Sequence, residues 1–216
     1  NSHRSFGLEF NQIDDLMENS PKLVGELRLI HMCSQSDGAC ALIFASEEKA
    51  KALAKKPPVW VRDHITVHRE EMFAIFGAEP YSTTHRYAAE KLYERNGIKD
   101  PRKEIDLFEM YDPSSWWGVD WLREFLLLEG DEHLRMIEDD EIAIDGSFPV
   151  NPSGGVIASN PIGATAMVRV AEAALQIMGK AGGHQVPKQV NQALASGFGG
   201  TMWTVLFLLT REVPRQ

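Results

Sequence analysis

Two apolar runs, each preceded by a small-residue turn, constrain the fold of this chain most strongly. Residues 39–45 read Ala-Cys-Ala-Leu-Ile-Phe-Ala and follow Ser-Asp-Gly, and residues 201–209 follow Gly-Phe-Gly-Gly. Apolar runs of this length without polar alternation are typical of strands buried on both faces of a sheet. We therefore expect a sheet covered on both sides, and the likeness of the two segments suggests a duplicated half.

Strand and helix signals alternate along the rest of the chain. Residues 59–67 and 105–111 are predicted strands, the first for its β-branched and aromatic content. A short helix near Ile13 ends before Pro21. Longer helices are predicted from their flanking start and stop residues at 47–56 after Ser46, 83–96 before Gly97, 116–128, and 164–178 before Gly179. This alternation indicates an α/β layered architecture.

Composition excludes several classes of function. The 216 residues include 22 Lys and Arg against 31 Asp and Glu, a formal net charge of −9, which provides no general attraction for nucleic acid or anionic lipid. The apolar runs are far shorter than the ~20 residues of a membrane span. The length suits one large or two small domains. Because the chain begins without Met, we expect a fragment or a processed piece.

The cysteines, histidines and acidic residues form no metal-binding pattern. Cys33 and Cys40 form neither a zinc motif nor a disulfide framework, so we interpret both as core residues and expect a cytoplasmic location. His64 and His68 fall in a predicted strand, where a spacing of four does not place them on one helix face. Residues 138–141, Glu-Asp-Asp-Glu, lack the spacing of a calcium loop. No metal is predicted.

An aromatic stripe on the predicted helix 116–128 allows two interpretations. Trp116, Trp117 and Trp121 are one and four residues apart. Such a stripe can form the wall of a binding site, but at helical spacing it more commonly belongs to the core. We expect the core.

Residues 151–165 are the most informative stretch of the sequence. Gly154 and Gly155 are followed by a Pro-containing turn with Gly163 and by a helix of small residues. This pattern places backbone, and a helix end with free N–H groups, close to a ligand. Close packing of the backbone against another element is an equally good explanation, and the residues alone leave both open.

This stretch resembles the thiolase signature, in which N-P-S-G-G is followed by G-H-P-x-G-A-T-G. Other segments resemble the sterol-carrier-protein type of thiolase: residues 36–39 its S-D-G-A, residues 106–111 its E-L-H-D-C-F, and residues 197–200 its late glycine turn. The resemblance covers almost the whole chain. It implies a layered fold of two duplicated halves, with residues 1–56 as the end of the first half and residues 57–216 as the complete second half.

The resemblance also implies site residues and partners. The nucleophilic Cys of the family would lie in a missing N-terminal half, which we expect as a partner together with a second copy in a homodimer. Asn160 replaces the His of G-H-P, and Phe108 replaces the His of H-D-C-F. An amide can donate a hydrogen bond to a thioester oxygen, but it cannot exchange a proton near neutral pH. Ordinary thiolysis is therefore in doubt.

Related acyl-CoA aldolases of steroid degradation use Tyr residues and a small partner with a zinc-ribbon and OB fold. Tyr111 follows the lost His position by three residues and is either a proton donor or acceptor or a core aromatic in place of the family's Phe. We predict Tyr111 and Asn160 as catalytic residues. The resemblance predicts substrate contacts at Gly154, Gly155, Phe108, Gly197, Phe198 and Gly199.

The predicted function is the cleavage or formation of a carbon–carbon bond in an acyl-CoA thioester, by a retro-Claisen or a retro-aldol route. The resemblance implies no cofactor other than coenzyme A, which is part of the substrate. The alternative is a non-catalytic thiolase-like module that binds acyl-CoA or lipid, or supports an assembly. The losses of His at positions 108 and 160 favour this module as much as an altered enzyme.

Overall fold

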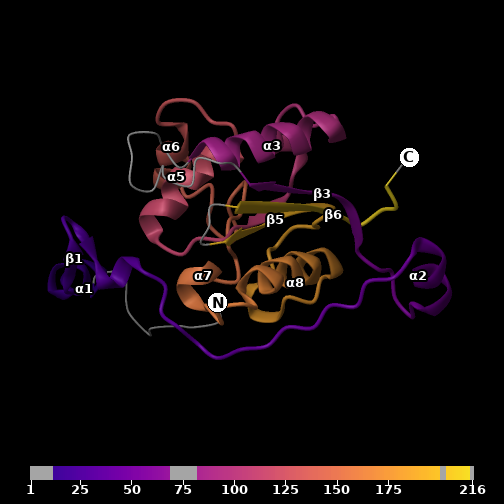
Figure 1. Cartoon of the computed structure of the whole chain (residues 1–216), viewed down its shortest axis with the longest axis horizontal. Helices are drawn as coiled ribbons and strands as arrows, with labels where there is room; N and C mark the ends of the chain where they lie inside the picture. The colour runs from indigo at the N-terminus through magenta and orange to yellow at the C-terminus, as the bar shows by residue number, and fades with distance from the viewer. Residues whose placement is uncertain (1–11, 69–81, 200–202, 215–216) are drawn as a thin grey trace.

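A computed structural model describes residues 12–68, 82–199 and 203–214 of the chain. Its centre is a four-stranded sheet in the order β3-β6-β5-β4 (Figure 1). Neighbouring strands are antiparallel except β4 and β5, which are parallel. The strands are β3 (Trp60–His68), β4 (Leu107–Glu109), β5 (Gln192–Gly199) and β6 (Trp203–Thr210).

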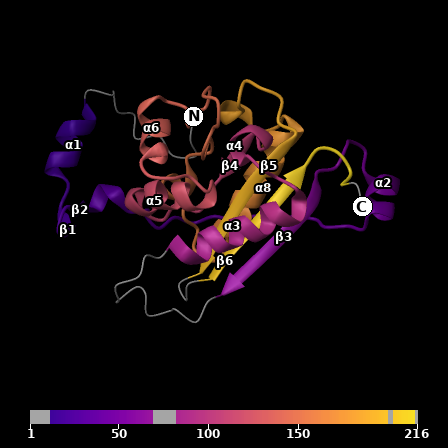
Figure 2. The same ribbon diagram turned by 90° about the horizontal axis from the view of Figure 1, so that it is seen from above.

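Helices cover the sheet on both faces. The helices α3 (Ser82–Asn96) and α5 (Ser115–Phe125) lie on one face, and α8 (Thr165–Met178) lies on the other, with the short α7 (Gly155–Ala158) beside it (Figure 1). Figure 2 gives the view from above, in which α3 crosses over the strands. Shorter helices are α4 (Pro101–Glu104) and α6 (Glu132–Glu138). The predicted layered α/β architecture is confirmed.

The N-terminal part of the chain lies beside and below this layered unit. It begins with α1 (Ile13–Asn19), a hairpin of β1 (Lys22–Val24) and β2 (Leu27–Arg28), and the short 3₁₀ helix η2 (Leu29–His31). An extended segment then passes under α8 to reach α2 (Glu47–Leu53) (Figure 1). The Ser46 hydroxyl accepts a hydrogen bond from the Lys49 N–H, so the predicted helix start is confirmed.

The predicted strand at residues 39–45 is wrong. The segment is extended but pairs with no strand of the described residues, and Ile43 is 97% exposed. An extended backbone becomes a strand only beside another strand, and the described sheet has none next to this segment. Cys40 is correspondingly not in the core, because its sulfur lies 3.7 Å from the Met167 carbonyl oxygen on the surface of α8.

The glycine segment at residues 197–199 is also not a turn, since it forms the end of β5. Gly197 pairs with Val205 and Phe198 with Thr204 of β6. A Cβ atom on Gly197 would lie 2.8 Å from the Ala166 Cβ, so glycine lets α8 pack closely on this strand. The sequence prediction missed β5 because Ala, Ser and Gly dominate it, and these residues have weak strand preference.

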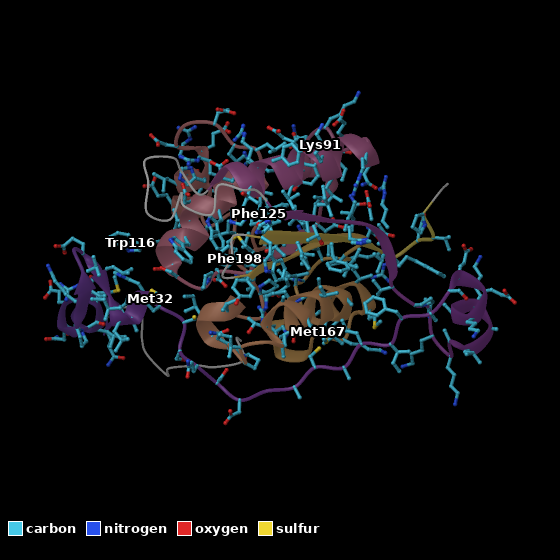
Figure 3. All side chains as sticks on the ribbon, viewed as in Figure 1. Met32, Lys91, Trp116, Phe125, Met167 and Phe198 are labelled. Carbon is cyan, nitrogen blue, oxygen red and sulfur yellow. The ribbon has the colours of Figure 1, made fainter. Side chains whose placement is uncertain are left out.

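Side chains of the strands alternate between two cores. Phe108, Leu194 and Leu206 point to the α3 and α5 side, where they pack with Trp121 and Phe125. Leu107, Ala193 and Leu209 point to α8 and pack with Val170 and Ile177. Figure 3 shows Phe125 above the sheet and Met167 below it. Trp121 is 1% exposed, as expected of a core residue. None of the helices described combines the length and apolar character needed to cross a bilayer.

Candidate functional site

The two segments that carry the predicted site residues are locked together by hydrogen bonds. The chain that leaves β4 runs beside residues 150–156. The Asn151 N–H donates to the Phe108 carbonyl at 2.8 Å, and the Met110 N–H donates to Asn151 Oδ1 at 2.6 Å. Further along both segments, the Val156 N–H donates to Asp112 Oδ1 at 2.6 Å. These bonds fix the position of Tyr111 between Met110 and Asp112.

The paired glycines serve this contact within the chain. Gly154 and Gly155 have φ angles of 96° and 66°, in the left-handed region that favours glycine. A Cβ atom on Gly155 would collide with the Asp112 carboxylate and the Asn151 amide. Of the two explanations that the sequence left open, close packing of the backbone on its own chain therefore accounts for Gly155. A substrate contact at either glycine stays a prediction.

A buried ion pair supports the same loop from the α8 side. Arg169 Nη1 donates to Glu109 Oε2 at 2.9 Å and to Ser153 Oγ at 2.7 Å, and both charged side chains are fully buried. The Ser153 hydroxyl and N–H also donate to the Glu109 carboxylate, at 2.7 and 3.1 Å. Arg169 Nε and Nη2 have no hydrogen-bond partner among the described residues. The buried guanidinium of Arg169 below the loop thus makes hydrogen bonds through only one of its three nitrogens among the described residues.

Asn160 and Tyr111, the two predicted catalytic residues, meet at Thr165. The Thr165 hydroxyl donates to Asn160 Oδ1 at 2.8 Å. Burial raises the pKa of the half-buried Tyr111 phenol, and a side-chain hydrogen bond with Thr165 partly offsets this shift. The structure therefore brings these residues into one cluster at the start of α8. Their catalytic roles stay predictions.

Cys33 joins this cluster, so its predicted place as a plain core residue is wrong. Asn160 Nδ2 donates to Cys33 Sγ at 3.2 Å, and the Cys33 N–H donates to the Pro113 carbonyl at 2.9 Å. Burial raises the pKa of the Cys33 thiol, the bond from Asn160 lowers it, and the charge of Asp112 raises it further. One hydrogen of the Asn160 amide is occupied by sulfur, which leaves the second for another acceptor.

Asp112 is a titratable group of the site that the sequence reasoning missed. Burial raises the pKa of its carboxyl from 3.8 to about 7, against the opposing effects of the Val156 N–H and the Arg169 guanidinium. Of the two catalytic residues predicted from the sequence motifs, Tyr111 is the titratable one. The structure adds Asp112 and Cys33, and the charge of Asp112 also raises the pKa of Tyr111.

The other predicted substrate contacts are separated by the sheet. Phe108 is fully buried on the α5 side, where its ring packs edge-on to Phe125 at 5.3 Å. Its side chain therefore faces the core and not the Tyr111 cluster. Phe198 lies 6.2 Å from the Tyr111 ring, measured between centroids. Gly197 faces α8 and lines a cavity of about 330 Å³ with Met167.

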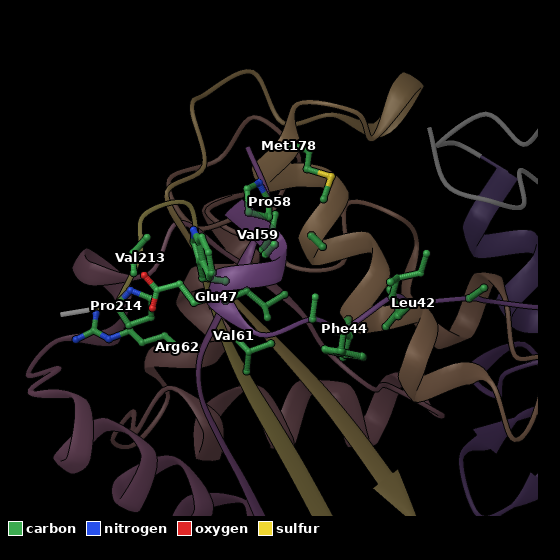
Figure 4. A pocket seen from close by; sticks show the side chains of 18 residues that line it. Leu42, Phe44, Glu47, Pro58, Val59, Val61, Arg62, Met178, Val213 and Pro214 are labelled. Atoms are coloured by element: carbon green, nitrogen blue, oxygen red, sulfur yellow. The ribbon is translucent and has the colours of Figure 1, made fainter. Parts of the chain in front are cut away.

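A larger apolar groove lies away from the cluster. It has a volume of about 780 Å³ and runs between the extended segment before α2, the end of α8 and the start of β3 (Figure 4). Leu42, Phe44, Val59 and Met178 line it, and neither Tyr111 nor Asn160 does. The described residues include no group of three or more His, Cys, Asp or Glu side chains arranged to hold a metal ion.

Comparison with known proteins identifies the family. Residues 71–211 match the family described as thiolase C-terminal domain-like. The chain is 30% identical to acetyl-CoA acetyltransferase of Methanothermobacter thermautotrophicus over 190 residues, which cover 85% of this chain and 47% of that protein. It is 27% identical to human (Homo sapiens) sterol carrier protein 2 over 217 residues, which cover 96% of this chain and 38% of that protein.

Among solved structures, the chain superposes on the Ltp2-ChsH2(DUF35) aldolase with a TM-score of 0.76 at 23% identity, covering 92% of this chain and 52% of that chain. The chain spans less than half the length of the two curated relatives above. Because the family match covers well over half of its residues, this chain belongs to the thiolase C-terminal domain-like family.

Proposed function

We propose that this chain is the C-terminal half of an enzyme that cleaves or forms a carbon–carbon bond beside the thioester of an acyl-CoA. Family membership and the likeness to an acetyl-CoA acetyltransferase support the substrate class. The likeness to an aldolase structure supports the carbon–carbon lyase version of this chemistry. Coenzyme A enters as part of the substrate, and we propose no other cofactor.

The observation that carries the proposal is the hydrogen-bonded series Tyr111, Thr165 and Asn160. A retro-aldol cleavage breaks the Cα–Cβ bond of the substrate. The β-hydroxyl loses its proton and becomes a carbonyl, and the electron pair of the broken bond forms an enolate, with negative charge on the thioester oxygen, that takes up a proton at Cα. Tyr111 supplies a phenol that shares the hydroxyl proton. The second amide hydrogen of Asn160 supplies a donor for the thioester oxygen. The two roles need no imidazole, and this agrees with the absence of His at positions 108 and 160.

The proposal includes partner chains. Ile43 and Phe44 are 97% and 66% exposed on the extended segment below α8, and an apolar surface of this kind is typical of an interface. We propose that the N-terminal half of the enzyme covers it and that two copies form a dimer. The name of the aldolase structure joins two components, which supports a second subunit. We propose that this subunit is small and has a zinc-ribbon and OB fold.

The test is an assay of the assembled protein with a β-hydroxyacyl-CoA and a β-ketoacyl-CoA, each with and without free coenzyme A. We expect cleavage of the β-hydroxy substrate without free coenzyme A, and its loss in Tyr111→Phe. Tyr87→Phe, on the outer side of α3, is the matched control and should keep full activity. Cleavage that strictly requires free coenzyme A would show thiolysis and remove Tyr111 from its central role.

Asn160→Ala tests the second role separately. Loss of one oxyanion donor of ordinary strength lowers kcat by roughly 100- to 1,000-fold. The melting temperature should change much less than kcat, because the backbone of Asn160 keeps its bonds to Ser36. An unchanged rate with a lower melting temperature would assign Asn160 to structure. If neither substrate turns over while coenzyme A still binds, the chain is part of an acyl-CoA-binding or scaffold subunit.

A further inference from the structure

Asn160 is held in place by a short N-terminal segment, residues 32–36, which lies outside the stretch that matches the family. The Asn160 N–H donates to Ser36 Oγ at 2.9 Å, and the Ser36 N–H donates to the Asn160 carbonyl at 3.3 Å. Gln35 forms a parallel bridge with Asn160 beside these bonds. The backbone at position 160 is therefore fixed by residues more than a hundred positions earlier in the chain.

The same segment also contacts the chain just after Tyr111. The Cys33 N–H donates to the Pro113 carbonyl at 2.9 Å, and Met32 forms an antiparallel bridge with Ser114. The segment is thus hydrogen-bonded to both parts of the chain that carry the predicted catalytic residues.

The side chain of Asn160 has a partner at each end of its carboxamide. Asn160 Nδ2 donates to Cys33 Sγ at 3.2 Å, and the Thr165 hydroxyl donates to Asn160 Oδ1 at 2.8 Å. A carboxamide has one acceptor oxygen and two N–H donors, so these contacts fix which end faces which neighbour. They leave one N–H of the amide for a further acceptor.

The contact with sulfur determines where that N–H lies. Half a turn of the carboxamide would exchange its oxygen and its nitrogen, and the spare N–H would move to the Thr165 side. The oxygen would then face the Cys33 thiol, which is only a weak S–H donor. The observed orientation instead pairs the amide oxygen with the stronger donor, the Thr165 hydroxyl, and an amide N–H with the sulfur.

We infer that Cys33 is a positioning residue of the site, whose sulfur holds the Asn160 carboxamide so that one N–H stays available to an acceptor such as a thioester oxygen. The use of this N–H in catalysis rests on the proposed function, but the hold on the carboxamide does not. In this role the thiol neither reacts nor exchanges a proton. Burial raises the pKa of Cys33, so its sulfur accepts the hydrogen bond as an uncharged thiol.

The first test follows the side-chain amide of Asn160 by NMR in the full protein labelled with ¹⁵N at its Asn residues. The Asn160 signal is the one that is absent from Asn160→Ala. Cys33→Ala should move this signal and speed its hydrogen exchange with water, because one N–H loses its acceptor. Cys40→Ala is the matched control, since Cys40 lies against the Met167 carbonyl, and it should leave the signal in place. A signal that is unmoved in Cys33→Ala would overturn the inference.

The second test is a double-variant cycle in the cleavage assay. Cys33→Ala should lower kcat by about 10- to 100-fold with little change in KM, because a misplaced donor is lost mainly in the transition state. In the Asn160→Ala background the same change should lower kcat no further, since Cys33 acts through Asn160. Losses that multiply independently would mean that Cys33 supports the fold and not the orientation of Asn160.

Cys33→Ser is the conservative variant, because its hydroxyl oxygen can accept the same hydrogen bond, and it should recover most of kcat. It also serves if Cys33→Ala does not fold, since oxygen in place of sulfur should still move the Asn160 signal. A protein that cleaves neither substrate but shows the expected signal changes would refute the carbon–carbon chemistry and keep the positioning role. Normal turnover with an unmoved signal would keep the chemistry and refute the role of Cys33.

Discussion

The two faces of the central sheet differ in the side chains that cover them. On the α3 and α5 face, aromatic and aliphatic side chains of the strands and helices close into a core, with Trp121, Phe125 and Phe108 each at most 1% exposed. On the α8 face, a buried ion pair lies under the loop 151–156, and an open apolar groove runs beside the helix. Among the described residues, side chains close over the first face, whereas the second face carries an open groove.

The two faces also differ in their ionisable groups. The α3 and α5 face contains His85, a histidine kept neutral among aromatic rings and bonded to Thr204. The α8 face is bordered by Asp112, a carboxyl whose pKa is raised by burial and whose neighbour Arg169 pairs with Glu109. The titratable groups near Tyr111 come from several parts of the chain: Arg169 from α8, Asp112 from the segment after β4, and Cys33 from the N-terminal segment. The two faces should therefore respond to pH in opposite directions.

The largest expected effect is acid destabilisation of the α3 and α5 face through His85. Burial lowers the pKa of His85 from 6.5 to about 3. Folding therefore disfavours its proton, and this contribution to stability is present above pH 6.5 and is lost as the pH falls toward 3. The full loss is about 5 kcal/mol over that range. Denaturant unfolding of the full protein between pH 7.5 and 4.5 measures the upper part of it.

The double variant His85→Phe/Thr204→Val tests this assignment. It removes both hydrogen-bonding partners together and so leaves no buried hydroxyl unpaired. The double variant should lose less free energy of unfolding than the unmodified protein when the pH is lowered. His64→Gln, which changes an exposed histidine of β3, is the control and should keep the original pH dependence. If both variants behave alike, His85 does not cause the acid loss.

The next effect concerns the buried pair on the α8 face. Arg169→Met leaves the Glu109 carboxylate buried without its cation, which typically costs 3–5 kcal/mol. The double variant Glu109→Gln/Arg169→Met should recover most of this loss because no buried charge is left. The matched control on the other face is Arg95→Met, which breaks an exposed pair with Asp63 and should cost about 1 kcal/mol or less. Equal costs for the two single variants would refute the contrast.

The expected pH response of the α8 face has the opposite sign. The folded-state pKa of Asp112, about 7, lies above its ordinary value of 3.8. Its contribution to stability is therefore complete below pH 3.8 and is lost as the pH rises to about 7. The total is about 4 kcal/mol. D112N should be more stable than the unmodified protein at pH 8, and the difference should shrink at pH 5 in the same unfolding assay.

Much of this fold was predictable because local signals agreed with the final structure. Ser46 begins α2, while Gly97 and Gly179 adopt the left-handed conformation that ends α3 and α8. The strand at residues 59–67 carries the β-branched residues that its place in the sheet requires. The family resemblance rested on spaced motifs and is confirmed by the family match.

The interior of the site was less predictable because its contacts join distant parts of the chain. Glu109 and Arg169 are 60 residues apart, and Asn160 and Cys33 are 127 apart. One signal was present in the sequence. Four polar side chains of α8 recur at helical spacing on its buried stripe: Thr165, Arg169, Glu172 and Gln176. Polar residues on an apolar helix face predict buried polar partners.

The strand that did not form at residues 39–45 teaches a related lesson. Its composition fits a strand buried on both faces, but composition cannot supply the neighbouring strands. In this chain the segment lies extended across α8 with Ile43 and Phe44 exposed. The composition of the segment predicts a strand, but a strand needs a neighbour to pair with, and the described residues provide none.

The smallest effect tests whether a partner completes the α8 face. Ile43 is 97% exposed in this chain, and an exposed residue can be replaced by Ser within about 0.5 kcal/mol. If the N-terminal half covers this segment, Ile43→Ser in the full protein should instead cost about 1.5–3 kcal/mol, as for a buried Ile. Val24→Ser on the exposed β1 strand is the control and should stay within the lower range.

Unfolding of the full protein, with its N-terminal half, measures the cost of both substitutions. Light scattering of the isolated 216-residue chain is the companion measurement. A stable monomer with a sharp transition, together with a small cost for Ile43→Ser, would mean that the open face needs no partner.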